Sequence, residues 1–237
     1  MSRENPLPNT TTGNEKPSPR NIAVIAWTGM DLTDFTSSIE VFSHVRDASR
    51  ARLYKTTTVG DDEISITSQG TAIKREITTE DFIASKESFD ILVIPGGGGF
   101  TGESMPQPAG LLSALREFKQ LDGGQGQRVI LSICAGSFFL GQAGLLEGKV
   151  ATAHPKSLAD LKRLCAKHGG STIVRQHYVD AGLSETGIRI VTSAGITSGF
   201  DAALYVVETE HGFPAADMAR AIMDAEYRRE ALPFGIF

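Results

Sequence analysis

The chain has 237 residues, of which 41% are hydrophobic and 22% charged, and it carries a formal net charge of −5. This composition is typical of a globular protein, and the absence of a clustered basic face argues against nucleic-acid binding. Two cysteines are too few for a disulfide framework and fit a reducing compartment. No stretch approaches the ~20 apolar residues of a membrane span, so we expect a cytoplasmic protein without a membrane partner.

The first part of the chain differs in composition from the rest. Residues 1–20 are polar and rich in proline, and they lack the apolar core of a secretory signal. We therefore predict a disordered tail over residues 1–20, followed by a single domain over residues 21–237.

Apolar patterning predicts alternating strands and helices after this tail. Short apolar runs predict strands at 22–27, 53–59, 89–94, 129–133 and 188–192, with a hairpin formed by 64–66 and 72–75. Apolar residues three or four positions apart predict helices near 35–45, 111–118, 135–143, 158–164, 202–211 and 215–227. This alternation predicts an α/β fold with a doubly wound parallel sheet and helices on both faces.

Cys134 directly follows the predicted strand at 129–133, and the small residues Ala135 and Gly136 open the next helix. A nucleophile between a buried strand and a helix is typical of a nucleophile elbow, where the tight turn presents the side chain at the carboxyl edge of the sheet. Amide groups and partial positive charge at the helix start favour a thiolate, so we predict a lowered pKa for Cys134. A buried structural cysteine is the alternative interpretation.

A run of glycines, Gly96 to Gly99, follows the predicted strand at 89–94. Glycines at a strand end let backbone N–H groups point at a reacting atom. We expect Gly97 and Gly98, with the amide of Ala135, to form an oxyanion-hole-type binding site. A plain turn is the alternative, and a phosphate loop is disfavoured because no Gly-Lys-Ser/Thr follows.

Two aspartates, Asp31 and Asp34, follow the first predicted strand. Loops after parallel strands open on the same edge of a doubly wound sheet, so Asp34 is expected to approach Cys134. Burial and like charge would raise the pKa of a carboxyl beside a thiolate and make it a proton donor. For Asp31 we expect a helix cap, and for Asp34 a cap remains the alternative.

His154 follows a short apolar segment and is a candidate pocket residue, with a purely structural histidine as the alternative. The five histidines and two cysteines of the chain show no metal-ligand spacing. We therefore expect no metal site.

Several segments together resemble the ThiJ/PfpI superfamily, whose members have a class I glutamine-amidotransferase-like, flavodoxin-type fold. Within it, the chain is similar to isocyanide (isonitrile) hydratases and to the amidase-like domain of AraC-type regulators. The matching segments are IPGG at 94–97, SICAG at 132–136, LGQAGLLEGK at 140–149, ATAH at 151–154, SAGITSGFD at 193–201, EY at 226–227 and PF at 233–234.

The resemblance implies roles for individual residues. The first loop of the hydratases reads Asp-Leu-Thr-Gly-Pro, and its aspartate is the catalytic acid. Alignment on the following helix places that acid at Asp34, whereas Asp31 begins a similar Asp-Leu-Thr three residues earlier, which leaves open which aspartate acts. Ser37 and Ser38 replace Gly-Pro, and Ala135 stands where the hydratases usually have threonine.

The resemblance further implies Cys134 as the nucleophile, with His154 and Thr197 as possible pocket residues. The implied activity is a cofactor-free hydro-lyase reaction that converts a small isocyanide and water to an N-substituted formamide. Alternatives are another hydratase or lyase reaction on a small electrophile in a biosynthetic pathway, a glyoxalase-III-like activity, and a non-enzymatic redox-sensing or regulatory role. Glyoxalase-III-like members usually place a glutamate near the cysteine, where this chain aligns an aspartate.

The resemblance also implies a homodimer, and the apolar residues 231–237 favour one as well. AraC-type relatives carry a helix-turn-helix domain after this one. The chain ends at Phe237, which is too soon for such a domain, and direct DNA binding is therefore disfavoured.

Overall fold

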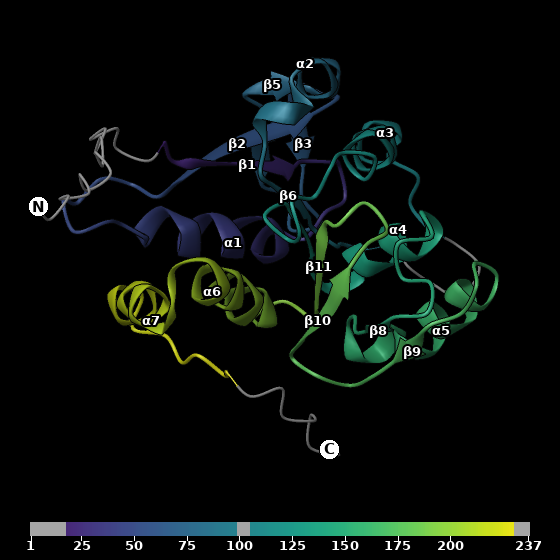
Figure 1. The fold of residues 1–237 in the computed structure, drawn as a ribbon. Helices are drawn as coiled ribbons and strands as arrows, with labels where there is room; N and C mark the ends of the chain where they lie inside the picture. Colours follow the sequence, from purple (N-terminus) through teal and green to yellow (C-terminus); the bar gives the residue numbers. More distant parts are fainter. Residues whose placement is uncertain (1–17, 99–104, 230–237) are drawn as a thin grey trace, which may run out of the picture.

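The computed structural model describes residues 18–98 and 105–229, and a seven-stranded sheet runs through its centre (Figure 1). In spatial order the strands are β10 (Tyr178–Leu183), β11 (Arg189–Ser193), β7 (Val129–Ser132), β6 (Ile91–Ile94), β1 (Arg20–Ile25), β2 (Tyr54–Gly60) and β5 (Ile77–Thr78). Two small sheets pair β3 (Ile64–Ile66) with β4 (Ala72–Lys74), and β8 (Val150–Ala151) with β9 (Thr172–Ile173). This is the predicted α/β fold of the flavodoxin-like type.

Neighbouring strands of the main sheet are parallel except at one edge, where β10 runs antiparallel to β11. The predicted parallel sheet therefore carries one antiparallel strand, β10, at its edge. The reason is the connection: β10 reaches β11 through a tight turn in which the amide of Gly187 donates to the carbonyl of Ser184 at 3.0 Å. A turn this short joins only antiparallel strands.

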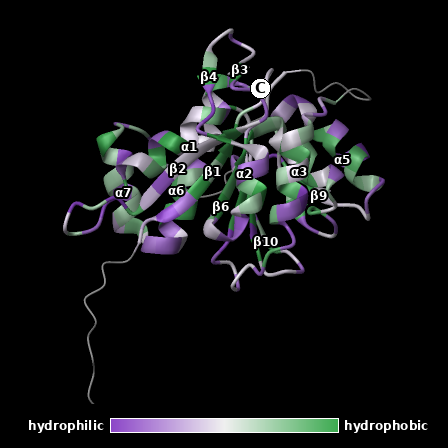
Figure 2. Ribbon diagram, turned by 90° about the horizontal axis from the view of Figure 1, so that it is seen from above, coloured by the Kyte–Doolittle hydropathy of each residue, from purple (hydrophilic) through white to green (hydrophobic). Residues whose placement is uncertain are grey.

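Helices cover both faces of the main sheet (Figures 1 and 2). On one face, α1 (Leu32–His44), α6 (Ser198–His211) and α7 (Phe213–Ile222) pack on one another. The other face carries α2 (Thr79–Ala84), α3 (Ala109–Phe118), α4 (Ser137–Gln142) and α5 (Leu158–Ala166). Short 3₁₀ segments are η1 (Lys86–Ser88), η2 (Cys134–Gly136) and η3 (Pro155–Ser157). Figure 2 shows hydrophobic residues concentrated in the strands between these two layers.

The strands that lead to the site are buried because the sheet is covered on both sides. All four residues of β6 and all four of β7 are buried, which explains their unbroken apolar sequence. Helix α1 contributes Phe35, Val41 and Phe42 to the same core. These elements therefore form a rigid support for the loops at their ends.

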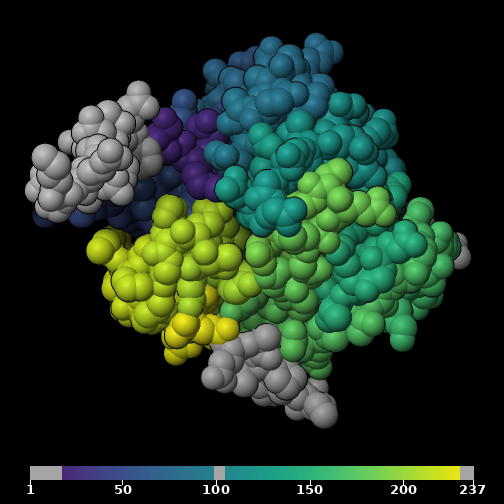
Figure 3. All heavy atoms as spheres, in the orientation of Figure 1, coloured from purple at the N-terminus to yellow at the C-terminus, as the bar shows by residue number. Residues whose placement is uncertain are grey.

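The start of β1 lies beside the C-terminal end of helix α6. In the space-filling view the start of β1 (purple) borders the C-terminal helices (yellow) (Figure 3). An ion pair joins them, with 3.2 Å between Arg20 Nη2 and Glu210 Oε1. Strand β1 begins at Arg20, one residue before the predicted domain boundary.

The predicted elements agree with the structure along most of the chain, with some differences. The sequence patterns did not predict β5, α2, β9 or β10, and the last helix ends at Ile222 rather than near residue 227. No helix in the described part of the chain is long and apolar enough to cross a membrane. The predicted disordered tail falls mostly within residues 1–17, which lie outside the described residues. The apolar residues 231–237 also lie outside them, so the homodimer remains a prediction.

Candidate active site

Cys134 lies at a strained turn at the carboxyl edge of the central sheet. Strand β7 ends at Ser132, and Cys134 opens η2 with a positive φ of 58°. The turn is fixed by two backbone bonds, from the amide of Ile133 to the carbonyl of Ile94 at 3.0 Å and from the amide of Cys134 to the carbonyl of Ala194 at 3.1 Å. A left-handed conformation at a residue with a Cβ costs about 1–3 kcal/mol and is enriched at functional sites. The local geometry is that of the predicted nucleophile elbow.

Asp34, in the first turn of α1, is fully buried beside Cys134. Burial raises the pKa of the Asp34 carboxyl to about 7, and the negative charge of Asp31 acts in the same direction. The Cys134 thiol and the Gly96 amide lower this pKa, but by less than burial raises it. Neither carboxyl oxygen has a partner at full hydrogen-bond geometry in the described chain. Asp34 therefore exchanges a proton readily near neutral pH.

Gly96 is the point at which three segments meet. A Cβ at this position would lie 2.6 Å from the amide nitrogen of Ala135 and 2.9 Å from Oδ2 of Asp34. At Gly136 a Cβ would lie 2.3 Å from the carbonyl oxygen of Ile94. Only residues without a side chain permit these approaches. The glycines thus bring the α1 carboxyl, the strand β6 loop and the elbow into contact.

The backbone amides around the sulfur come from two segments. The amides of Ala135 and Ile196 both act on the Cys134 thiol and lower its pKa. Gly97 pairs with Met30 in an isolated antiparallel bridge. The hydrogen bonds of this bridge are made by the neighbouring residues, so they do not use the amide of Gly97. The Gly98 amide instead donates to the carbonyl of Gly29 at 3.2 Å, which removes it from the donor set expected from the sequence.

The pKa of the Cys134 thiol is raised, and the sequence-based expectation of a lowered value is wrong. Burial is the main cause, because the residue is only 7% exposed, and the charge of Asp34 adds to it. The amides of Ala135 and Ile196 oppose this rise without overcoming it. The helix that was expected to supply positive charge begins as the 3₁₀ turn η2, and α4 after it is only six residues long. At neutral pH the thiol therefore keeps its proton, and the Asp34 carboxyl is the group of the pair that gains and loses one.

A cavity of about 300 Å³ opens at Cys134. Its described lining residues are Asp31, Ser68, Gly97, Gly98, Cys134, Ala135, His154, Ser157 and Ile196. Four sequence-predicted residues besides Cys134 are thus in this lining. Asp34 is absent from it and lies behind the sulfur, shielded from solvent. This volume suits a small molecule, which would meet the sulfur before it met the carboxyl.

The two further pocket candidates differ in position. His154 lies in the cavity wall, where its Nδ1 accepts from the amide of Lys156 at 3.2 Å and leaves the proton on Nε2. Burial, with the charge of Lys156, lowers the pKa of His154, so the ring is neutral at pH 7. Thr197 is exposed at the N-cap of α6 and is not among the described lining residues.

Sequence reasoning missed Ile196, Ser68 and Ser157 as lining residues. Ile196 has a φ of 34°, an unfavourable conformation for a β-branched residue, and this strain points its amide at the sulfur. No sequence pattern predicts a positive φ at such a residue. Ser68 comes from the tip of the β3–β4 hairpin, which the sequence predicted without indicating where it docks.

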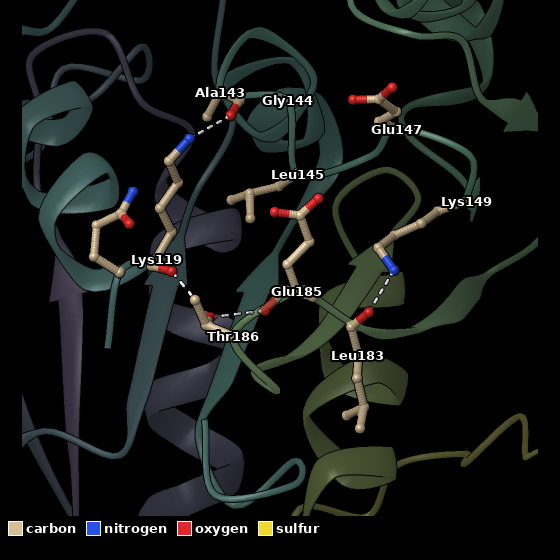
Figure 4. A pocket seen from close by; sticks show the side chains of 11 residues that line it. Lys119, Ala143, Gly144, Leu145, Glu147, Lys149, Leu183, Glu185 and Thr186 are labelled. Atoms are coloured by element: carbon tan, nitrogen blue, oxygen red, sulfur yellow. Dashed lines mark hydrogen bonds between the residues drawn. The ribbon is translucent and has the colours of Figure 1, made fainter. Parts of the chain in front are cut away.

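A second, larger cavity of about 530 Å³ lies beside the β10–β11 turn, away from Cys134 (Figure 4). Figure 4 shows Lys119 and Lys149 directed at main-chain oxygens, those of Ala143 at 2.7 Å and Leu183 at 2.6 Å. No cysteine or histidine is among its described lining residues. The smaller cavity is therefore the candidate active site. Within residues 18–98 and 105–229, no three His, Cys, Asp or Glu side chains gather into a metal-binding group.

The chain is similar in sequence and in fold to known proteins. The sequence model of the DJ-1/PfpI family matches residues 20–209. An isonitrile hydratase of Pseudomonas putida is 29% identical over 188 residues, which are 79% of this chain and 70% of that protein. An uncharacterised protein encoded in the cpoL 5′ region of Streptomyces lividans is 31% identical over 148 residues, covering 62% of this chain and 96% of the relative. A solved ThiJ/PfpI family protein of Pseudomonas syringae superposes with a TM-score of 0.68 at 23% identity, covering 97% of this chain and 84% of that one.

Proposed function

The chain belongs to the DJ-1/PfpI family, and we propose that it is a cofactor-free, cysteine-dependent hydro-lyase that hydrates a small isocyanide. One observation carries the proposal: a carboxyl whose pKa is raised to about 7 is buried against a cysteine that lines a cavity. Addition to an isocyanide places a sulfur and a proton on the same carbon, so it needs a nucleophile and a proton carrier at one point. The similarity to an isonitrile hydratase supports this reaction.

In the first step, the sulfur of Cys134 forms a bond to the terminal carbon of R–NC. The thiol proton passes to Asp34 and from there to that same carbon, giving the thioimidate R–N=CH–S–Cys134. The hydrogen that ends on the carbon therefore comes from the thiol, carried by Asp34. General acid–base transfer of this kind contributes typically ~10²–10⁴-fold to a rate.

In the second step, water adds to the thioimidate carbon and delivers a proton to nitrogen. The carbon–sulfur bond then breaks, the thiol recovers its proton and R–NH–CHO leaves. The amides of Ala135 and Ile196 stabilise negative charge on sulfur while this bond forms and breaks. The sum is one isocyanide and one water to one formamide.

Turnover of cyclohexyl isocyanide in D₂O tests this sequence of steps. We expect cyclohexylformamide with deuterium at the formyl carbon, because the transferred proton comes from an exchangeable thiol. Intact-mass analysis of the stopped reaction should detect an adduct of the isocyanide on Cys134. Formation of the formamide by a Cys134→Ser variant at the wild-type rate would contradict the proposal.

Other electrophiles belong in the same assay, because a fold does not fix a substrate. Methylglyoxal and a small nitrile would compete for the same sulfur. Turnover of one of these in place of the isocyanide would change the proposed substrate but keep the proposed roles of Cys134 and Asp34. A redox-sensing role receives less support, because oxidation proceeds through the thiolate and the raised pKa of Cys134 disfavours that form.

A further inference from the structure

Asp31 lies between the elements that build the site, although its sequence pattern indicates only a helix cap. Its Oδ1 accepts from the amide of Thr33 at 2.9 Å and from the amide of Asp34 at 3.2 Å. The bond to the amide of Asp34 fixes the backbone of the residue that carries the buried carboxyl. Its own amide donates to the carbonyl of Gly96 at 3.0 Å, the glycine that contacts Asp34 from the other side.

The second oxygen of Asp31 is held by the β3–β4 hairpin. Its Oδ2 accepts from the side-chain amide of Gln69, and Oε1 of Gln69 in turn accepts from the amide of Leu32 at 3.0 Å. The side chain is half-buried and lines the cavity at Cys134. No lysine, arginine or histidine of the described chain forms an ion pair with it. Three hydrogen bonds thus fix a negative charge in the cavity wall, and no cation neutralises it.

We propose that Asp31 is a positioning residue for the Cys134–Asp34 pair, acting through its bond to the amide of Asp34 and through the charge that it holds in the cavity wall. The inference rests on the proposed proton transfer from Cys134 to Asp34, and it does not depend on which electrophile is the substrate. A helix cap would need only the hydrogen-bonding oxygen. The charge would add a function that a neutral cap lacks.

The direction of the effect follows from electrostatics. A fixed negative charge disfavours a second one nearby, so Asp31 raises the pKa of Asp34 and keeps its proton available near pH 7. The titratable groups acting on Asp34 are Asp31 and Cys134. Acidic groups of the helices packed on α1 are paired with arginines: Asp201 with Arg228, Glu208 with Arg229, Glu210 with Arg20, and Asp217 with Arg220. A test of this effect therefore removes the charge of Asp31.

The experiment follows alkylation of Cys134 by iodoacetamide between pH 5 and 9, with mass spectrometry of the peptide that contains it. In wild type the rate should rise through a midpoint near the Asp34 pKa of about 7, because only the ionised carboxyl can accept the thiol proton as the sulfur is alkylated. Asp31→Asn keeps a good N-cap and removes the charge. Its midpoint should move to lower pH, which makes alkylation at pH 6 about threefold to tenfold faster than in wild type.

Three further variants separate charge from structure. Asp31→Ser is a second neutral cap and should shift the midpoint in the same direction, which keeps the test valid if Asp31→Asn does not fold. Gln69→Ala removes the hydrogen bonds of Gln69 to Asp31 and Leu32 and leaves the charge, so its midpoint should stay at the wild-type value. Asp47→Asn removes a charge beyond the other end of α1, about 20 Å away along the helix, and should also leave it unchanged.

The possible results are distinct. A midpoint that falls in both neutral-cap variants and stays in Gln69→Ala and Asp47→Asn supports the proposal. An unchanged midpoint in the folded neutral-cap variants overturns it, and so does an equal shift in Asp47→Asn. Because alkylation needs no isocyanide, an enzyme without hydratase activity could still show the shift. Failure of the proposed reaction and failure of this inference are therefore distinguishable.

Discussion

The two cysteines of the chain are both buried, but they differ in backbone conformation, in access to a cavity and in the groups beside them. Cys134 is 7% exposed and Cys165 1%, and burial raises the pKa of both thiols. Cys165 lies in the regular helix α5 and packs on α4 near Gly141. Cys134 has a left-handed conformation, lines a cavity and faces the buried carboxyl of Asp34.

The difference shows that burial alone does not identify a reactive cysteine. Burial raises the pKa of Cys165, and a hydrogen bond with the side chain of Ser171 opposes the rise. The raised pKa of Cys134 comes with Asp34, which takes up the proton when the sulfur reacts. What distinguishes the elbow is a second titratable group and access from a cavity.

The largest expected effect separates the two cysteines directly. Cys134→Ala should lower the rate of isocyanide hydration by about 10⁴-fold or more, because the covalent route is lost. Cys165→Ala should retain most of the activity, since Cys165 is not among the described lining residues of the cavity at Cys134. Steady-state rates with circular dichroism of both folded variants provide the measurement. Equal losses of activity in the two variants would contradict the assignment of Cys134 as the nucleophile.

The next effect concerns the proton carrier. Asp34→Asn should lower turnover by about 10²–10⁴-fold, because the amide keeps the shape and cannot transfer a proton at neutral pH. Cys134 should remain open to alkylation in this variant. Asp31→Asn is the matched control and should cost far less turnover at pH 7. If Asp31→Asn is the inactive variant and Asp34→Asn is not, the assignment of the acid is wrong by three residues.

A matched pair of glycines tests how tightly the two regions are built. Gly96→Ala places a Cβ against a backbone amide at 2.6 Å, and we expect it to lower the free energy of unfolding by about 1–3 kcal/mol. Gly141→Ala meets the Cys165 sulfur at 3.1 Å from within a helix, so gain and loss should nearly cancel. Urea denaturation of both variants gives the values. Greater destabilisation by Gly141→Ala would show that the α5 region is the tighter one.

The last effect is on stability and depends on pH. Because the pKa of Asp34 is raised to about 7 in the folded state, its proton stabilises that state at low pH, and this contribution is lost as pH rises from ~4 through 7. Asp34→Asn should therefore become more stable than wild type with rising pH, by on the order of 1–4 kcal/mol at pH 8. Denaturation at pH 4, 6 and 8 measures the difference. If the difference in stability between Asp34→Asn and wild type does not change with pH, ionisation of the Asp34 carboxyl does not destabilise the folded state.

Much of the fold and part of the site could be predicted from the sequence. The apolar runs that became β6 and β7 predicted buried strands, and the order of strand, Cys134 and small residues predicted the elbow. Short elements were missed, because two residues such as Ile77 and Thr78 hold too little periodic signal. The antiparallel strand β10 was missed as well, since its sequence alternates weakly and a bulge between Asp180 and Leu183 interrupts its pairing.

The sequence by itself determined which residues can do chemistry here: a cysteine after a buried strand, small neighbours beside it and an aspartate after the first strand. Tertiary structure decided their ionisation. Whether the Cys134 thiol loses its proton easily depends on its burial and on Asp34, which lies 100 positions earlier in the chain. Local sequence favoured a lowered pKa, and the folded surroundings raised it. Desolvation is a property of everything packed around a group, and no local pattern contains it.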